Sequence, residues 1–114
     1  MAALKRSYRL SGRKTINGIL RSGRRMGAGG LTVYVLQSKN LNTRVAVIVP
    51  KKVDKRAVKR NKLRRQISEI MRKIIPQIIE PLDIIIYAGP QSAGSGFDGL
   101  EKTLNAVFKK LIQA

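Results

Sequence analysis

The sequence contains no cysteine and no histidine, and only six of its 114 residues are acidic. The absence of cysteine excludes disulfides and thiolate metal sites, and the absence of histidine removes the commonest general base. Six carboxylates leave little material for an enzyme that carries its own metal ions or acid–base groups. The chain is therefore poorly equipped to catalyse a reaction by itself.

Long apolar runs are also missing. The longest, at 45–50 and 82–89, fall far short of the roughly 20 residues that span a bilayer. No apolar segment follows the charges near the start, so we expect a cytoplasmic protein that does not enter membranes. Hydrophobic residues still make up 43% of the chain, which suits a folded protein with one core. The length predicts a single domain over residues 1–114.

Positive charge is what the sequence has in excess. Its 24 lysines and arginines give a formal net charge of +18. The segment 5–25 carries eight of them and no acid, and the segment 51–73 carries eleven against only Asp54 and Glu69. A small domain with such one-sided charge is typical of proteins that bind a polyanion, and nucleic acid is the leading candidate.

The spacing of apolar and turn-forming residues predicts six elements in the order α-β-β-α-β-α, a small α+β sandwich. The expected elements are a helix over about 11–21, strands over 31–36 and 44–49, a helix over about 55–75, a strand over 82–88 and a helix over about 98–112. We expect 37–43 to be a hairpin loop that pairs the first two strands, after a chain break at the glycines of 27–30. Strand 44–49, the long helix and strand 82–88 form a βαβ unit, and the helices pack on one side of the sheet.

Each predicted helix has a candidate for its first or last residue. Ser11, Asp54 and Asp98 are residues that commonly cap a helix N-terminus. Gly23 is expected to stop the first helix, and Pro76 ends the long one.

The long helix carries the strongest functional signal. Leu63, Ile67, Ile70 and Ile74 recur at helical spacing and form one apolar stripe. The opposite side is polar and mostly cationic, with Asn61, Arg64, Arg65, Ser68 and Arg72, and with Lys62 and Lys73 beside them. A charged helix face is usually only solvated, but it then tends to mix Glu and Lys. Here nearly every charge is positive and the side chains repel one another, which favours a face that binds phosphates.

The approach to this helix is cationic too. Lys51 and Lys52 follow a strand end, and Arg60 and Asn61 fall early in the helix. Asparagine is a poor helix former at an interior position. Two roles for Asn61 remain open at this point: a hydrogen bond to backbone at the corner, or contact with a phosphate, a sugar or the water of a bound ion.

Two motifs and their spacing resemble a known family. Arg-Val-Ala-Val-Ile-Val-Pro-Lys-Lys at 44–52 is followed by Ala-Val-Lys-Arg-Asn-Lys-Leu-Arg-Arg at 57–65 and by Arg72. This is similar to the protein subunit of bacterial ribonuclease P, in which a strand ends in Val-Ser/Pro-Lys-Lys and the next helix reads Ala-Val-x-Arg-Asn-x-x-Lys/Arg-Arg. The segments 8–23 and 82–90 match more loosely, so the resemblance covers nearly the whole chain.

The resemblance implies a left-handed βαβ crossover, although the opposite hand is the strong default. It also implies a function: the protein helps a catalytic RNA to remove the 5′ leader of precursor tRNA. The implied reaction is endonucleolytic hydrolysis by metal-bound water, with Mg²⁺ held mainly by the RNA and none bound tightly by the protein. The implied partners are the catalytic RNA, with one protein monomer per RNA, and precursor tRNA.

The resemblance assigns two sets of binding residues and no catalytic residue. The set implied to bind the catalytic RNA comprises Lys51, Lys52, Lys55, Arg56, Lys59, Arg60, Asn61, Lys62, Arg64, Arg65, Ser68 and Arg72. The set implied to line a leader-binding cleft, between the first helix and the sheet, comprises Arg9, Arg13, Lys14, Ile16, Leu20 and Tyr34. The basic residues of the second set, together with Tyr8, could instead form a flexible arm.

The chain departs from the family pattern in two places. Ile16 and Leu20 stand where the family has phenylalanines, and neither can stack on a leader base as an aromatic ring does. Gly89 stands where the family often has an arginine before the proline. The cleft would then depend on apolar contact, on cations and on Tyr34, which could equally be ordinary strand packing. The remaining rings, Tyr87, Phe97 and Phe108, are expected in the core.

Three other functions fit parts of the sequence. A small basic ribosomal protein would share its size and charge, but not the spacing of the Lys-Lys and Arg-Asn pairs. A nuclease that acts without RNA would need groups that the chain lacks. A protein that binds membrane surfaces would need an aromatic or wide apolar helix face for insertion.

Overall fold

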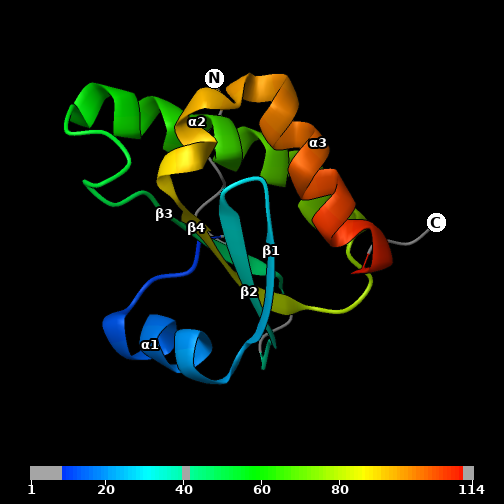
Figure 1. The fold of residues 1–114 in the computed structure, drawn as a ribbon. Coiled ribbons are helices and arrows are strands. Elements are labelled where there is room, and N and C mark those ends of the chain that lie inside the picture. The colour runs from blue at the N-terminus through cyan, green and yellow to red at the C-terminus, as the bar shows by residue number, and fades with distance from the viewer. Residues whose placement is uncertain (1–8, 40–41, 112–114) are drawn as a thin grey trace.

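The computed structural model describes residues 9–39 and 42–111, and it places helices on both faces of one four-stranded sheet (Figure 1). The main elements are α1 (Arg13–Ser22), β1 (Arg24–Ala28), β2 (Leu31–Gln37), β3 (Arg44–Ile48), α2 (Ala57–Ile74), β4 (Leu82–Ala88) and α3 (Gly96–Phe108). Three 3-10 helices follow α2, β4 and α3, namely η2 (Ile75–Gln77), η3 (Pro90–Gly94) and η4 (Lys109–Leu111). The α+β class and the six predicted elements are confirmed, and β1 is added to them.

The sheet has the strand order β1-β2-β4-β3. β2 pairs antiparallel with both β1 and β4, and β3 pairs parallel with β4. The predicted hairpin between the strands at 31–36 and 44–49 is therefore wrong, because β4 lies between them. The real hairpin joins β1 to β2 through Gly29 and Gly30, whose φ angles of 57° and 83° suit a two-residue turn. β1 itself was missed because four of its five residues are exposed and its sequence Arg-Arg-Met-Gly-Ala has no alternating apolar pattern.

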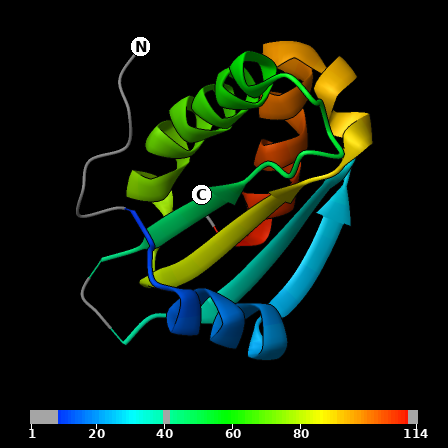
Figure 2. The same ribbon diagram turned by 90° about the vertical axis from the view of Figure 1, so that its left-hand side faces the viewer.

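The sequence predicts that the helices pack on one side of the sheet, and this prediction is wrong. α2 and α3 pack side by side on one face, whereas α1 crosses the other (Figure 2). The reason is that the inner strands are apolar on both sides. Ile85 of β4 is fully buried on the α1 face, where it packs with Leu10 and Ile19. The second face therefore also needs a covering helix.

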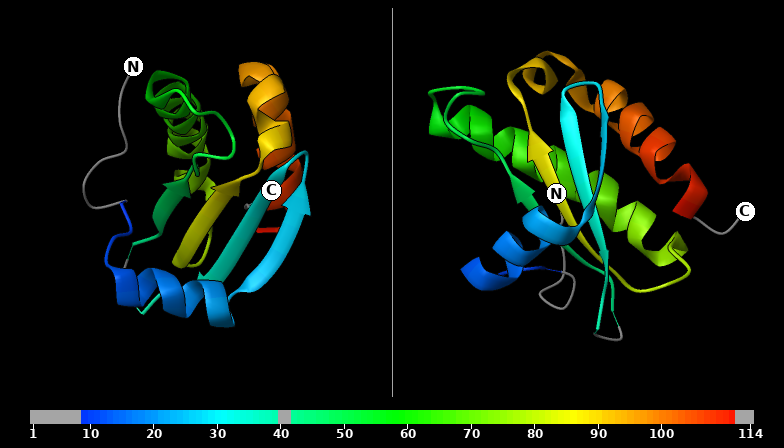
Figure 3. Two further views of the ribbon diagram at one scale, coloured as in Figure 1. Left: turned by 60° about the vertical axis from the view of Figure 1, so that its left-hand side comes forward. Right: turned by 60° about the horizontal axis from the view of Figure 1, so that its bottom comes forward.

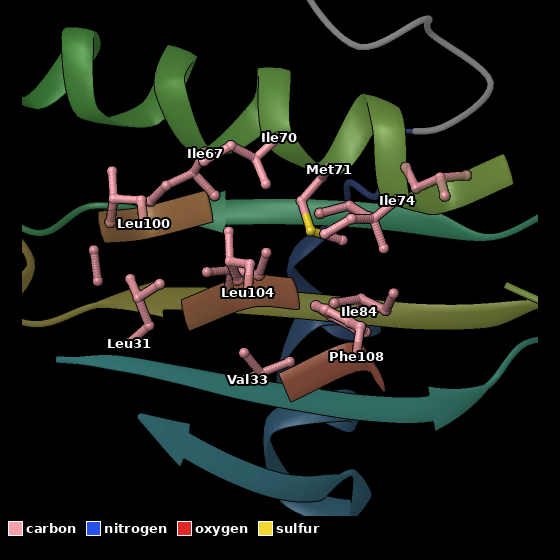
Figure 4. Close-up of a cluster of buried hydrophobic side chains, with 14 of the residues drawn as sticks. Leu31, Val33, Ile67, Ile70, Met71, Ile74, Ile84, Leu100, Leu104 and Phe108 are labelled. Carbon is pink, nitrogen blue, oxygen red and sulfur yellow. The ribbon is translucent and has the colours of Figure 1, made fainter. Parts of the chain in front are cut away.

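The main core lies between the sheet and the pair α2–α3 (Figure 4). The predicted stripe of α2 is confirmed, since all four of its residues are buried, and Met71 joins them. α3 contributes Leu100, Leu104 and the fully buried Phe108. Each buried side chain of this size contributes about 1.5–3 kcal/mol of transfer free energy. That burial fixes the rotation of α2 and turns its cationic side outward.

The crossover from β3 through α2 to β4 is left-handed. Both strands point to the upper left in Figure 1, so they point toward the viewer in the left panel of Figure 3, where that side comes forward. In that panel α2 lies above the sheet, and the chain passes from β3 on the left to β4 on the right. A right-handed crossover would pass to the left in this view. The crossover thus has the left hand that the resemblance implies, which is an exception to the usual rule.

The three predicted N-caps are wrong, although the helices begin close to them. α1 begins after Gly12, α2 after Arg56 and α3 after Ser95, and none of these residues makes a side-chain capping bond. Asp98 instead lies in the first turn of α3, where a carboxylate still favours the helix dipole. Gly23 does follow the last residue of α1, and its N–H donates to the carbonyl oxygen of Ile19. Glycine fits this position because a Cβ there would lie 2.6 Å from the same oxygen.

Candidate nucleic-acid interface

The outward side of α2 and the loop before it form a continuous cationic surface, here called the α2 surface. Its members are the twelve residues assigned above to the catalytic RNA, from Lys51 to Arg72. All of them are exposed except Arg60 and Ser68, which are half-buried. The buried apolar stripe of α2 holds the helical part of this surface in place, so the polar side chains on the opposite side of α2 project away from the core.

Two arginines of the α2 surface already have acidic partners. Arg56 binds both carboxylate oxygens of Asp54 at 3.0 Å, and its backbone N–H donates to the same carboxylate at 2.9 Å. These bonds lower the pKa of Asp54 from its ordinary 3.8 to about 2. Arg72 binds Glu69 one helical turn away, at 2.6 and 3.3 Å, which likewise lowers the pKa of that carboxyl. Two of the few acids in the chain thus keep two guanidinium groups in fixed positions.

Arg60 and Asn61 have local partners of their own. Arg60 Nη1 donates to the carbonyl oxygens of Asp54 and Lys55, both at 2.9 Å, and so closes the loop that leads into α2. Asn61 Oδ1 accepts a hydrogen bond from Arg64 Nη1 at 2.9 Å. The backbone bond considered for Asn61 is therefore replaced by a side-chain bond. Arg64 still has donors left for a ligand, because a guanidinium carries five.

Other cations of the α2 surface are uncompensated. Within the described chain, Lys59, Lys62 and Arg65 form no ion pair with an acidic side chain. They lie at i, i+3 and i+6 of one exposed helix, so they raise the local positive potential and repel one another. A row of phosphates placed against them would remove that repulsion.

A second candidate surface lies where α1 crosses the sheet, and we call it the α1 cleft after the leader-binding cleft that the resemblance implies. Leu10, Ile19 and Ile85 form a small core there, and five partly buried residues pack against it: Ile16 and Leu20 of α1, Tyr34 of β2, and Ala46 and Ile48 of β3. The structure thus brings together the three uncharged residues that the resemblance assigned to leader binding. Tyr34 is half-buried in this cluster, so its ring packs and also reaches the surface.

The charged residues of the predicted cleft are more dispersed. Arg9 runs beside β3, where it bridges to Val45 and is exposed, and Arg13 is the exposed first residue of α1. Lys14 lines a hollow on the other side of α1, together with Arg44 and Asp83. Lys14 is therefore not grouped with Ile16 and Leu20. Tyr8 lies outside the described residues.

Sequence reasoning missed two residues of the sheet face that α1 crosses. Tyr87 was expected in the core, and that expectation is wrong. It is half-buried on this face, and the Nζ atom of Lys52 lies 5.6 Å from the centre of its ring. Arg25 of β1 is exposed on the same face, as the cross-strand partner of Tyr34. Strand alternation could have placed Tyr87 beside Ile85, whereas Arg25 could not be placed without recognising β1.

The other two rings behave as expected. Phe108 is fully buried, and Phe97 packs against the main core with Lys73 Nζ 5.7 Å from its ring centre. Both lie on the side of the sheet away from the α1 cleft.

The arrangement supplies positive charge, apolar surface and rings. In the part of the chain that the structure describes, no three acidic side chains gather where they could hold a metal ion. None of its helices is long and apolar enough to cross a membrane. Cations of this kind suit phosphates, and apolar surface with aromatic rings suits unpaired bases.

Comparisons with known proteins agree along almost the whole chain. A family model described as Ribonuclease P matches residues 4–112. A ribonuclease P protein component from Lactobacillus gasseri is 30% identical over 107 residues, which cover 93% of this chain and 88% of that one. The protein of the same description from Clostridioides difficile is 36% identical over 81 residues, or 70% of each chain.

Solved structures show the same fold. The RNase P protein of Staphylococcus aureus superposes with a TM-score of 0.83 at 26% identity, covering 93% of this chain and 98% of that one. The RNase P protein of Thermotoga maritima gives a TM-score of 0.80 at 23% identity, with the same coverage. At that identity the second likeness concerns the fold alone.

Proposed function

Because this chain belongs to the ribonuclease P protein family, we propose that it binds the catalytic RNA of that enzyme and the 5′ leader of precursor tRNA. In this role it assists the endonucleolytic step that produces mature tRNA 5′ ends. The proposal places it in the cytoplasm, where precursor tRNA is made, as one monomer per catalytic RNA.

One observation supports the proposal: a cationic helix surface and an apolar surface with a tyrosine ring lie on opposite faces of one sheet. The α2 surface is a rigid helix side with uncompensated cations, which suits the regular phosphates of a folded RNA. The α1 cleft is apolar and contains a ring, which suits the bases of a single strand. A protein that bound one folded RNA alone would need only the first.

The physical contribution of the protein is charge neutralisation and positioning. Cations near the leader lower the repulsion between the precursor and the catalytic RNA, and a held leader aligns the scissile phosphate with the RNA site. We assign the Mg²⁺ ions of the reaction mainly to the RNA, since the described protein residues offer no cluster of three acidic ligands. When bound there, Mg²⁺ supplies the activated water and stabilises the leaving oxygen.

The test is cleavage of precursor tRNA by the matching catalytic RNA at low Mg²⁺, with and without this protein. We expect the protein to raise both the cleavage rate and the affinity for precursor, and to lose its effect as Mg²⁺ or salt rises. Unchanged turnover and affinity would contradict the proposal. The protein alone, freed of RNA, should not cleave; robust cleavage by it would instead identify a nuclease that acts without RNA.

A further inference from the structure

Tyr87 lies on an inner strand of the sheet, yet its aromatic ring is not fully buried. It lies near the end of β4, the strand that is buried along almost its whole length, yet it is itself only half-buried. It belongs neither to the main core nor to the cluster around Ile85. Its ring is therefore not needed to fill either interior, and it faces the side of the sheet that α1 crosses.

On the β1 side, the neighbours of Tyr87 in the sheet have a short side chain or none. Its partner on β2 is Thr32, whose own partner on β1 is Gly27, which has no side chain. Its partner on β3 is Ile48, which packs toward the α1 cleft. The ring is thus flanked toward the β1 edge by a short side chain and then by bare backbone. A flat ligand can approach it from that edge.

A cation lies over this ring. Lys52 Nζ is 5.6 Å from the ring centre, within the range of a cation–π contact. Lys52 is exposed and its side chain is flexible, and within the described chain it forms no ion pair. Its ammonium can therefore leave the ring for a phosphate while a base takes its place. This combination suits a nucleotide, because the ring can stack on the base while the mobile cation contacts the phosphate.

The position of Tyr87 relative to Tyr34 extends the α1 cleft. Tyr34 pairs with Ile85, so Tyr87 is its diagonal neighbour on the same face, at a spacing of about 7–8 Å between such positions. Two bases could each contact one ring without stacking on each other. The direction from Tyr34 to Tyr87 also leads toward Lys51 and Lys52, where the α2 surface begins.

We propose that Tyr87 is a base-stacking residue for the single-stranded leader, with Lys52 as the cation that takes the adjoining phosphate. This inference rests on the proposed function and adds to it. In this chain the stacking surface lies on the sheet, at Tyr34 and Tyr87. Ile16 and Leu20 of α1, which cannot stack, supply apolar contact only.

The test uses the complex of this protein with its catalytic RNA and compares Tyr87→Leu with Tyr87→Phe. Leucine keeps an apolar side chain and removes the ring face, whereas phenylalanine keeps the ring and removes the hydroxyl. We expect Tyr87→Leu to weaken binding of leader-bearing precursor by roughly 5- to 150-fold, the range that corresponds to one stacked base. Binding of mature tRNA and of the catalytic RNA should stay unchanged, and Tyr87→Phe should bind like the original protein.

A second variant keeps the question decidable if Tyr87→Leu does not fold. The chain contains no tryptophan, so Tyr87→Trp introduces a single indole that retains a stacking face. We expect its fluorescence to change when leader-bearing precursor binds and to stay constant with mature tRNA. A control indole at the exposed Lys102 of α3, in Lys102→Trp, should respond to neither.

The outcomes separate the inference from the proposed function. If the original complex did not prefer leader-bearing precursor over mature tRNA, the proposed function would fail, whatever Tyr87 does. If it did prefer the precursor, three results would overturn the inference alone: Tyr87→Leu binding within twofold of the original, Tyr87→Phe as weak as Tyr87→Leu, or a Tyr87→Trp signal that ignores the leader.

Discussion

Arg44 and Asp83 face each other across the parallel strands β3 and β4, and two hydrogen bonds join them. Arg44 Nε and Nη2 donate to the two carboxylate oxygens, each at 3.1 Å. Asp83 is only 7% exposed, and a buried carboxylate is costly without such a partner. The pair therefore holds the first residue of β3 against β4, in the register that places Ala46 and Ile48 beside the α1 cleft.

Removing the guanidinium from this pair should destabilise the fold. We expect Arg44→Met to lower the free energy of unfolding by about 2–3 kcal/mol, because it leaves the Asp83 carboxylate buried without its charged donor. Urea unfolding of the isolated protein measures this change. Lys102→Met, at an exposed position of α3, is the matched control and should change it by less than about 0.5 kcal/mol. Equal values for the two variants would show that the pair contributes nothing to stability.

Asp54 should make part of the free energy of unfolding depend on pH in the acidic range. Its pKa in the folded protein is about 2, below its ordinary 3.8, because Arg56 binds the carboxylate. A lowered pKa means that the stabilisation is complete above the unfolded value and is lost as the pH falls through the folded one. The denaturant concentration at the midpoint of unfolding should therefore decrease as the pH is lowered from about 4 to about 2. It should decrease less steeply in Asp54→Asn. Parallel curves for the two proteins would contradict this assignment.

How far the sequence predicts this fold depends on which residues carry the pattern. The stripe from Leu63 to Ile74 is periodic and apolar, so both the position of α2 and its outward cationic side could be predicted. β1 could not, because its five residues, Arg-Arg-Met-Gly-Ala, have neither β-branched or aromatic side chains nor apolar alternation, and the local signal is the Gly29–Gly30 pair. Missing β1 also led to the wrong hairpin, since β2 was then left without its true partner.

The candidate site, too, could be predicted from the sequence only in part. The Lys-Lys and Arg-Asn motifs can be read from the sequence because they lie on one helix and the loop before it. The α1 cleft depends on which strand lies beside which, and the order β1-β2-β4-β3 follows from long-range pairing that no local pattern encodes. Tyr87 was misplaced for this reason: in an almost wholly apolar strand, nothing local shows that one face is left partly open.

The α2 surface should set the salt dependence of RNA binding. Replacing Arg64 and Arg65 together by alanine should weaken binding to the catalytic RNA. It should also flatten the plot of log K against log salt by roughly 0.7–0.9 for each phosphate that the variant no longer neutralises. Titrations at several salt concentrations measure this slope. Lys102→Ala combined with Lys109→Ala removes the same charge from exposed positions in and just after α3, and it should leave the slope unchanged. A slope that responds equally to both pairs would make α2 an ordinary solvated helix.

Tyr34 should distinguish precursor tRNA from mature tRNA. Its side chain is half-buried against the small core of Leu10, Ile19 and Ile85, so Tyr34→Ala removes both packing and a stacking face. We expect the complex with the catalytic RNA to lose roughly 5- to 150-fold in affinity for leader-bearing precursor and little for mature tRNA. Tyr34→Phe, which keeps the ring, is the control and should bind both RNAs like the original protein. An equal loss for precursor and mature tRNA would mean that Tyr34 only supports the fold, because a structural defect does not depend on whether a leader is present.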